Sequence, residues 1–177
     1  MTPAVIADPV AAVLARCQHF QNVREQPIAS NRSPEIDYWL EATGVPFGNA
    51  WCAAYVSQMG LEALGAAWPV LRSASVQQIV DWAKHAGLAL EERPAPGMLM
   101  VLYFPAPLNR YAHIGIVAAV RADGSFTSWE GNTRVAGDPA AKGLSEREGY
   151  RVALQTRTVT SRIRFIDWTV LLQKRTG

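Results

Sequence analysis

Residues 98–133 read MLMVLYFPAPLNRYAHIGIVAAVRADGSFTSWEGNT, and this stretch decides the fold. It contains two apolar runs, 98–104 and 114–120, whose length and composition predict buried strands. Asp123 and Gly124 then give a hairpin-turn signal that leads into a third strand at 126–130. An antiparallel sheet is therefore expected here.

The chain after this stretch continues the sheet. A polar, glycine-containing loop between Gly131 and Gly149 is long enough to suggest a functional role. Two further strands are predicted near 150–158 and 162–168. The C-terminal half thus predicts an antiparallel sheet of about five strands.

The chain before this stretch reads as helices. They are expected near 11–20, 33–44, 50–64 and 75–87. Ser33 is a good cap for the second helix, Asn49 for the third, and Ser73 or Ser75 for the fourth. N-terminal helices packed on an antiparallel sheet define an α+β class. We expect a single domain, with a helical extension at 1–30 and a catalytic domain at 31–177.

The composition excludes several classes of protein. The chain has 177 residues, 49% hydrophobic and 18% charged, with a net charge of +2 and scattered Lys and Arg residues, so nucleic acid is not an expected partner. No apolar run approaches the roughly 20 residues of a membrane span. Asp8 and Pro9 interrupt the start where a signal peptide needs an apolar core. We expect a soluble monomer made in the cytoplasm.

The two cysteines, Cys17 and Cys52, are too few for a disulfide framework or a thiolate zinc site. A bridge between the two remains open at this stage. Cys52 lies in the first turn of a predicted helix, where the dipole favours a thiolate. A small buried core residue is the alternative role for Cys52. Cys17 is read as packing and His19 as a surface residue.

A nucleophilic cysteine needs a base, and the base needs an orienting group. His113 opens one predicted strand, and Glu130 and Asn132 end the next. A hairpin loop of two residues (123–124) or four (121–124) pairs odd positions before it with even positions after it. The three side chains then share one face of the sheet.

The same register sorts the neighbouring residues. Small residues accompany His113 on its face, so that another element, such as the helix of Cys52, can approach: Gly115, Ala119 and Ser128. Bulky residues fill the opposite face: Ile114, Ile116, Val120 and Trp129.

Three motifs carry a resemblance to a known family. They are GNAWCAAYVS at 48–57, HIGIV at 113–117 and EGNT at 130–133, with NRSPE at 31–35 upstream. Together they resemble the CHAP domains, the cysteine, histidine-dependent amidohydrolases/peptidases of phage endolysins and bacterial wall hydrolases. That family is related to the NlpC/P60 and papain-like folds. The resemblance covers roughly residues 30 to 168.

The resemblance implies the site and the substrate. Cys52 is then the nucleophile, His113 the general base and acid, Glu130 the group that orients the imidazole, and Asn132 a polar support. The substrate is the peptidoglycan stem peptide, cut at an internal bond or at its bond to muramic acid. No cofactor is implied. No metal is implied either, because the acidic calcium-binding loop of some members has no counterpart here.

Further assignments remain expectations. Asn49, Trp51 and Trp129 adjoin the motifs and are the candidate substrate-binding residues. The backbone N–H of Cys52 is a candidate oxyanion donor, and the side chain of Asn49 a weaker one.

Two other functions stay open. One is an amidase or a protein-deamidating toxin of the same fold that acts outside the wall. The other is a non-catalytic binding module, and it is disfavoured because none of the cysteine, histidine and glutamate is missing. A phage lysin released by a holin, a secreted effector and a fragment of a larger protein all fit as settings.

Overall fold

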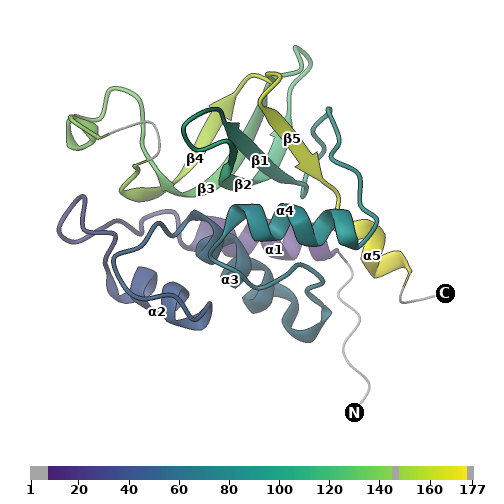
Figure 1. The fold of residues 1–177 in the computed structure, drawn as a ribbon, viewed down its shortest axis with the longest axis horizontal. Helices are drawn as coiled ribbons and strands as arrows, with labels where there is room; N and C mark the ends of the chain where they lie inside the picture. The colour runs from purple at the N-terminus through teal and green to yellow at the C-terminus, as the bar shows by residue number, and fades with distance from the viewer. Residues whose placement is uncertain (1–7, 145–147, 175–177) are drawn as a thin grey trace.

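The computed structural model describes residues 8–144 and 148–174. The start of the predicted helical extension, 1–7, and the end of the predicted catalytic domain, 175–177, lie outside the described residues. The N-terminal half forms helices that cover one face of an antiparallel sheet built by the C-terminal half (Figure 1). The predicted α+β class is therefore confirmed.

The sheet has five strands in the order β4-β3-β2-β1-β5, all antiparallel to their neighbours. Their bounds are β1 Leu99–Phe104, β2 Arg110–Val120, β3 Phe126–Thr133, β4 Arg151–Arg157 and β5 Ile163–Ile166. The two longest strands, β2 and β3, run side by side, and they supply the polar residues of the site.

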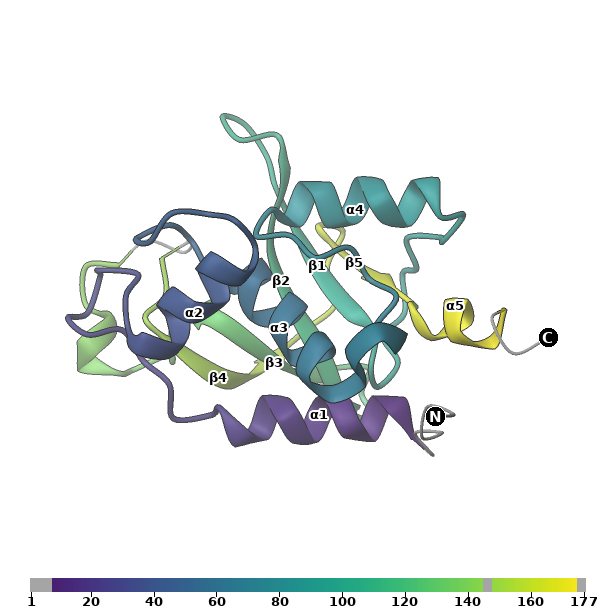
Figure 2. The same cartoon turned by 90° about the horizontal axis from the view of Figure 1, so that it is seen from below.

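The helices lie in one layer below the sheet. Their bounds are α1 Pro9–His19, α2 Pro34–Ala42, α3 Cys52–Leu64, α4 Val76–His85 and α5 Thr169–Gln173, with short 3₁₀ turns at Gly65–Ala67 and Pro139–Ala141. Seen from below, α3 crosses the middle of the sheet, with α1 and α4 on either side of it (Figure 2). None of the described helices has the length and apolar character of a membrane span.

Local capping explains where two helices begin. The Ser33 hydroxyl accepts the N–H of Ile36, and the Ser75 hydroxyl accepts the N–H of Gln78, so both predicted caps are confirmed. The predicted cap at Asn49 is wrong. Trp51 occupies the N-cap position of α3 without a side-chain cap, and the Asn49 amide instead donates to the carbonyl of Pro46 at 2.9 Å.

α3 is the centre of the hydrophobic core, because most of its 13 residues are buried. Val13 and Cys17 of α1 pack into the same core, so the predicted helical extension shares it with the rest of the chain. Gly131 of β3 allows the close approach, since a Cβ there would lie 2.8 Å from the Trp51 ring and from Tyr55. The start of α3 is thereby fixed against the sheet.

The β2–β3 hairpin reaches the predicted pairing by an unexpected route. The pair nearest the turn is Val120 with Phe126, so residues 121–125 form a longer turn than either predicted loop. The register then shifts by one position between Val117 and Ala119. Beyond this bulge, Val117 pairs with Ser128 and Ile116 with Trp129. Odd positions of β2 therefore face even positions of β3, as predicted.

The bulge corrects the predicted faces at the turn end. Ala119 pairs with Thr127 and Val120 with Phe126, so these two β2 residues lie on the faces opposite to those predicted. Further from the turn the prediction is confirmed, because three of the bulky residues pack in or against the core that contains α3: Ile114, Ile116 and Trp129.

The predicted approach of the Cys52 helix to the His113 face is wrong. α3 packs on the other face of the sheet, at Gly131. The space above Gly115 is taken by Glu130 instead, whose Cγ would lie 2.7 Å from a Cβ at that position. The missing side chain of Gly115 thus makes room for a buried carboxylate rather than for a helix.

Candidate active site

Cys52 is the first residue of α3 and only 4% exposed. The N–H groups in the first turn of a helix have no intrahelical partner and carry the positive end of the dipole. The Cys52 side chain lies close enough to His113 to interact with it, and this interaction is one of the causes that raise the pKa of His113. The sequence-predicted nucleophile and base are therefore brought together.

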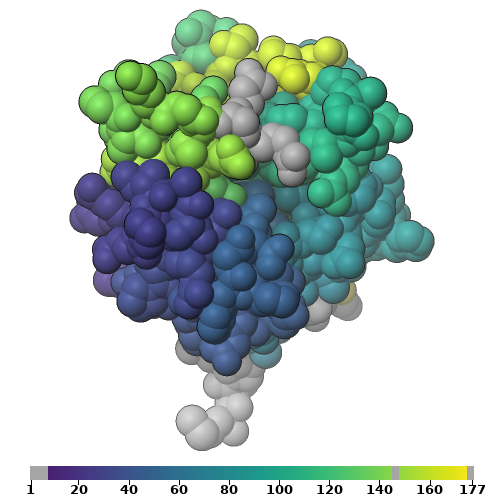
Figure 3. Space-filling model, turned by 60° about the vertical axis from the view of Figure 1, so that its left-hand side comes forward, coloured from purple at the N-terminus to yellow at the C-terminus, as the bar shows by residue number. Residues whose placement is uncertain are grey.

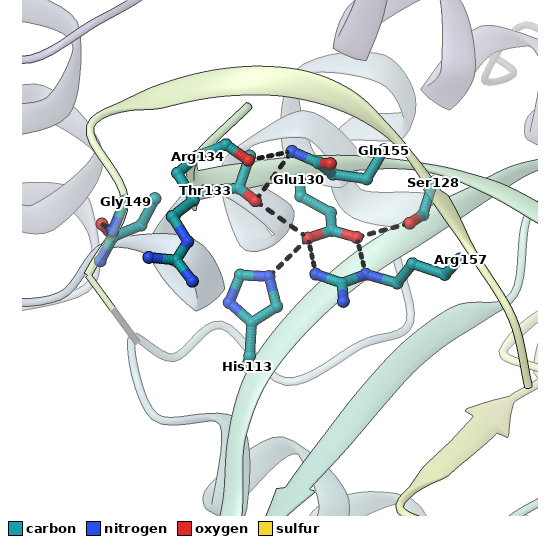
Figure 4. Close-up of polar contacts among 9 residues, drawn as sticks. His113, Ser128, Glu130, Thr133, Arg134, Gly149, Gln155 and Arg157 are labelled. Carbon is teal, nitrogen blue, oxygen red and sulfur yellow. Dashed lines mark hydrogen bonds and ion pairs between the residues drawn. The ribbon is translucent and has the colours of Figure 1, made fainter. Parts of the chain in front are cut away.

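His113 lies near the start of β2 and presents its imidazole to Glu130 of β3. Its Nε2 is 2.7 Å from Oε2 of Glu130. A dashed line marks this contact in Figure 4. Because Nε2 is engaged in this way, Nδ1 is the ring nitrogen left to serve Cys52. The imidazole is therefore held between a thiol and a carboxylate.

Glu130 is fully buried, and its carboxylate is surrounded by donors from three strands. The guanidinium of Arg157 on β4 makes two hydrogen bonds to it, from Nε at 2.5 Å and from an Nη at 2.6 Å (Figure 4). The hydroxyl of Ser128 donates to it at 2.6 Å and that of Thr133 at 3.3 Å. These contacts fix the carboxylate in place for His113.

The charges of this group are set by mutual contacts. Burial acts to raise the pKa of Glu130, but the hydrogen bonds from Arg157 and the charge of His113 outweigh it and hold that pKa well below its usual range. Burial likewise acts to lower the pKa of His113, yet the Glu130 charge and the interaction with Cys52 raise it to about 9. At neutral pH the imidazole therefore carries a proton beside the Cys52 sulfur.

Two cavities flank His113. One, which we call the Cys52 cavity, has a volume of about 450 Å³ and is lined by Thr43, Val45, Asn49, Ala50, Cys52, Arg72, Ser73, Ala74, Ser75, Val76, Gln78, Arg110, Tyr111 and Ala112. The other, the His113 pocket, has about 220 Å³ and is lined by Leu102, Phe104, His113, Asn132, Thr133, Arg134, Gln155, Arg157 and Arg162. The thiol thus lines one cavity and the imidazole lines the other.

The Cys52 cavity lies where the two halves of the chain meet, whereas the His113 pocket is lined by the C-terminal half alone. The helical half supplies the start of α3 and the segment before α4, and the other half supplies the start of β2. Figure 3 shows the purple and blue surface of the N-terminal half next to the green surface of the C-terminal half. The Cys52 cavity is bordered by residues of both halves.

Asn132 lies in the same pocket as His113 but has a contact of its own. Its backbone φ is +51°, at the bulge that separates Glu130 from Thr133 in the pairing with β4. Its Oδ1 accepts the N–H of Gly149 at 3.1 Å, which ties the end of the long loop to β3. Its observed hydrogen bond therefore holds backbone in place beside the imidazole.

The three predicted substrate-binding residues differ in placement. Asn49 is exposed and lines the Cys52 cavity. Trp51 is fully buried, its indole N–H donates to Glu25 at 3.0 Å, and it is absent from the lining of both cavities. Trp129 packs against the core on the face opposite Glu130 and is also absent from the lining of both cavities.

Arg157 is the part of the site that the sequence reading missed. In the sequence, Arg157 is an arginine in an alternating strand, 151–157, on the same side as Gln155. Its contact with Glu130 could not be predicted, because the long loop 134–149 leaves the register of β4 against β3 undetermined. The structure pairs Phe126 with Arg157, which brings the guanidinium diagonally to Glu130.

The remaining titratable candidates have structural surroundings. Cys17 and Cys52 are both free thiols, so no bridge joins them. Burial, partly opposed by a hydrogen bond with Tyr55, raises the pKa of Cys17 to about 12. His19 is exposed, and Nδ1 of His85 lies 2.7 Å from the carbonyl of Asp81 at the end of α4. These residues lie outside the site.

Within residues 8–144 and 148–174, His, Cys, Asp and Glu side chains form no cluster of three or more that could hold a metal ion.

Comparison with known proteins places the chain in a family. No curated protein and no solved structure matches the chain. A family model of the CHAP domain matches residues 44–132, half of the chain, and this match spans Cys52, His113, Glu130 and Asn132. The chain therefore belongs to the CHAP domain family of peptidoglycan amidase- and peptidase-type hydrolases.

Proposed function

We propose that this chain is a cysteine hydrolase that cleaves an amide bond of peptidoglycan through an acyl-enzyme. The bond is the one between muramic acid and the stem peptide, or one within that peptide. One observation carries the proposal: His113 is held at 2.7 Å by the buried carboxylate of Glu130 and interacts with Cys52, at the start of a helix. A nucleophile, a base and an orienting group in that order are the parts of a cysteine amidase.

The proposed reaction has two steps. The Cys52 thiolate attacks the amide carbonyl, and the imidazolium of His113 gives its proton to the departing amine, so that a thioester forms as the C–N bond breaks. His113 then takes a proton from water, whose oxygen attacks the thioester, and the carboxylic acid product leaves with the thiolate restored. Glu130 stays ionised throughout and stabilises the imidazolium.

The oxyanion of each tetrahedral intermediate needs donors that are already in place. The backbone N–H of Cys52 is the first candidate, because it belongs to the unpaired first turn of α3. The Asn49 side chain is a second candidate, since it lines the same cavity and its bond to Pro46 uses only one of its two amide hydrogens.

Arg157 acts in this scheme as a positioning residue. It does not line the Cys52 cavity, but its two hydrogen bonds orient Glu130 and neutralise part of its charge. We propose that it limits how strongly Glu130 holds the imidazolium proton, which has to leave during each cycle. The proposed site then consists of four residues in contact order: Cys52, His113, Glu130 and Arg157.

Two other functions compete with this one. An amidase or a deamidating enzyme of the same fold would use the same residues on a substrate outside the wall. A silent binding module would keep the fold without turnover. The presence of all the reacting groups favours an enzyme, and the family favours the wall as the place of action.

Purified sacculi with diaminopimelate-type and lysine-type stems test the proposal. We expect soluble fragments whose new termini, identified by mass spectrometry, define one amide bond. Release should continue in EDTA and stop after treatment with iodoacetamide. Release that stops in EDTA and returns with zinc would contradict the cysteine mechanism. Turnover of a non-wall amide with intact sacculi would favour the first competing function.

A further inference from the structure

The lining of the Cys52 cavity is basic. It includes Arg72, from the segment before α4, and Arg110, the first residue of β2, and none of its lining residues is acidic. The two arginines come from the two halves of the chain that meet at the site. A cavity that contains the proposed nucleophile is therefore bordered by positive charge from both sides.

These two arginines differ from five others in the molecule, which are engaged by carboxylates. Arg16, Arg32, Arg151, Arg157 and Arg164 each form an ion pair with a carboxylate. In the part of the chain that the structure describes, neither Arg72 nor Arg110 has such a partner, and both are exposed. Their guanidinium groups are therefore available to a ligand.

The ligand chemistry follows from the side chains. A guanidinium offers a planar set of N–H donors that matches a carboxylate and binds it with two hydrogen bonds. The start of α4 lines the same cavity and adds the positive end of its dipole. A neutral amide substrate would leave all of this charge unused, whereas a peptide with a free carboxylate would pair with it.

We propose that the Cys52 cavity selects peptides that carry a free carboxylate close to the bond that is cut, and that Arg72 and Arg110 bind this carboxylate. The inference rests on the proposed function, because it assigns the substrate class of the same site. Stem peptides contain carboxylates next to amide bonds, and an amidated stem presents the same backbone without the charge. Selection would therefore separate amidated from non-amidated walls.

Binding to an inactive protein tests the inference without turnover. We would titrate Cys52→Ala with a synthetic stem peptide and with a panel in which each carboxylate in turn is replaced by a carboxamide, using calorimetry. One replacement should weaken binding by about 10- to 100-fold, the effect of losing a charged hydrogen-bonded partner. Adding Arg72→Gln or Arg110→Gln should weaken binding of the parent peptide and remove its advantage over that carboxamide.

Arg93→Gln is the matched control, because Arg93 is exposed and absent from the lining of either cavity. It removes one positive charge and should leave both affinities unchanged. The inference is overturned if the parent peptide fails to bind, if all carboxamides bind as well as it does, or if Arg93→Gln has the same effect as the cavity variants.

Hydrolysis of the same panel by the unmodified protein separates this inference from the proposed function. Selective binding without cleavage of any peptide would support the carboxylate site and contradict the hydrolase. Cleavage of every peptide at the same kcat/KM would support the hydrolase and overturn the carboxylate site.

Discussion

Glu130 is a single buried carboxylate that faces two cations, the guanidinium of Arg157 and the imidazolium of His113. A buried charge is tolerated only when it is paired and hydrogen-bonded, and here its partners also belong to the proposed reaction. The two cations compete for the same negative charge. Changing Glu130 or Arg157 should therefore move the proton affinity of His113 in opposite directions.

Glu130→Gln should lower turnover by roughly 10²- to 10⁴-fold, as removal of orienting or proton-transfer groups does elsewhere. Burial then acts on His113 without the opposing Glu130 charge, so the pKa of His113 falls from about 9. The alkaline limb of the kcat/KM profile should move to lower pH. Glu92→Gln, at a carboxylate whose side chain is 80% exposed, is the control. Near-normal turnover with an unmoved limb is incompatible with the proposed role of Glu130.

Arg157→Gln should have the opposite effect on the pH profile. Without the guanidinium, the Glu130 charge acts on His113 alone, so the alkaline limb should move to higher pH. Leaving the buried carboxylate with one cation fewer should lower the free energy of unfolding by about 3 kcal/mol. The measurements are a kcat/KM profile and urea unfolding. A loss of stability with an unchanged limb would reduce Arg157 to a structural role.

The β2–β3 hairpin is the element that assembles the site. The length of its loop and the alternation of side chains along each strand predicted that His113 and Glu130 share a face, and the 2.7 Å contact confirms this. The bulge near Ala118 was not predictable from the sequence, because its position depends on how the folded strands pack. The register shifts next to Val117, which lies in one hydrophobic cluster with Phe126. The face that α3 occupies was also predicted wrongly. Gly115 indicated that another group approaches closely, but the sequence did not show that this group is Glu130 rather than α3.

Two glycines of this hairpin should respond differently to alanine. Gly131→Ala puts a Cβ 2.8 Å from the Trp51 ring, so it should cost about 1 to 3 kcal/mol of stability through overpacking. Gly115→Ala puts a Cβ 2.7 Å from Cγ of Glu130, so it should displace the carboxylate and lower kcat by about tenfold or more. Thermal unfolding and steady-state hydrolysis distinguish them. A fully active Gly115→Ala would contradict the close packing of Glu130.

At the scale of the whole molecule, the buried charges make stability depend on pH. The folded-state pKa of His113, about 9, lies above its ordinary value of 6.5, so its contribution is complete below about pH 6.5 and is lost as pH rises through 9. The pKa of Glu130 is depressed, so its contribution is present above about pH 4.5 and is lost as pH falls below that. Stability should therefore be greatest between these limits.

Urea unfolding from pH 4 to 10 measures this dependence. The loss between pH 6.5 and 9.5 should approach roughly 3 kcal/mol, the equivalent of the shift of the His113 pKa. Glu130→Gln should flatten that slope, because the charge that raises the pKa is gone. Equal slopes in the two proteins would show that the pair does not carry the pH dependence.

How much of the molecule the sequence predicts depends on the range of the interaction. The caps at Ser33 and Ser75 and the five strands follow from local chemistry and were predicted. Burial of Trp51 and the arrival of Arg157 at Glu130 depend on contacts across the fold and on a register that follows a long loop. Adjacency to a motif in the sequence therefore did not reveal which residues line the cavities.

The central claim is that Cys52, and not the second thiol, is the nucleophile. The most direct measurement compares the release of fragments from purified sacculi by the unmodified protein, Cys52→Ala and Cys17→Ala, with folding checked by circular dichroism. Cys17 is fully buried with a raised pKa, so Cys17→Ala should keep most of the activity. Cys52→Ala should remain folded and lose roughly 10³-fold or more. Equal activity of the two folded variants would contradict the account.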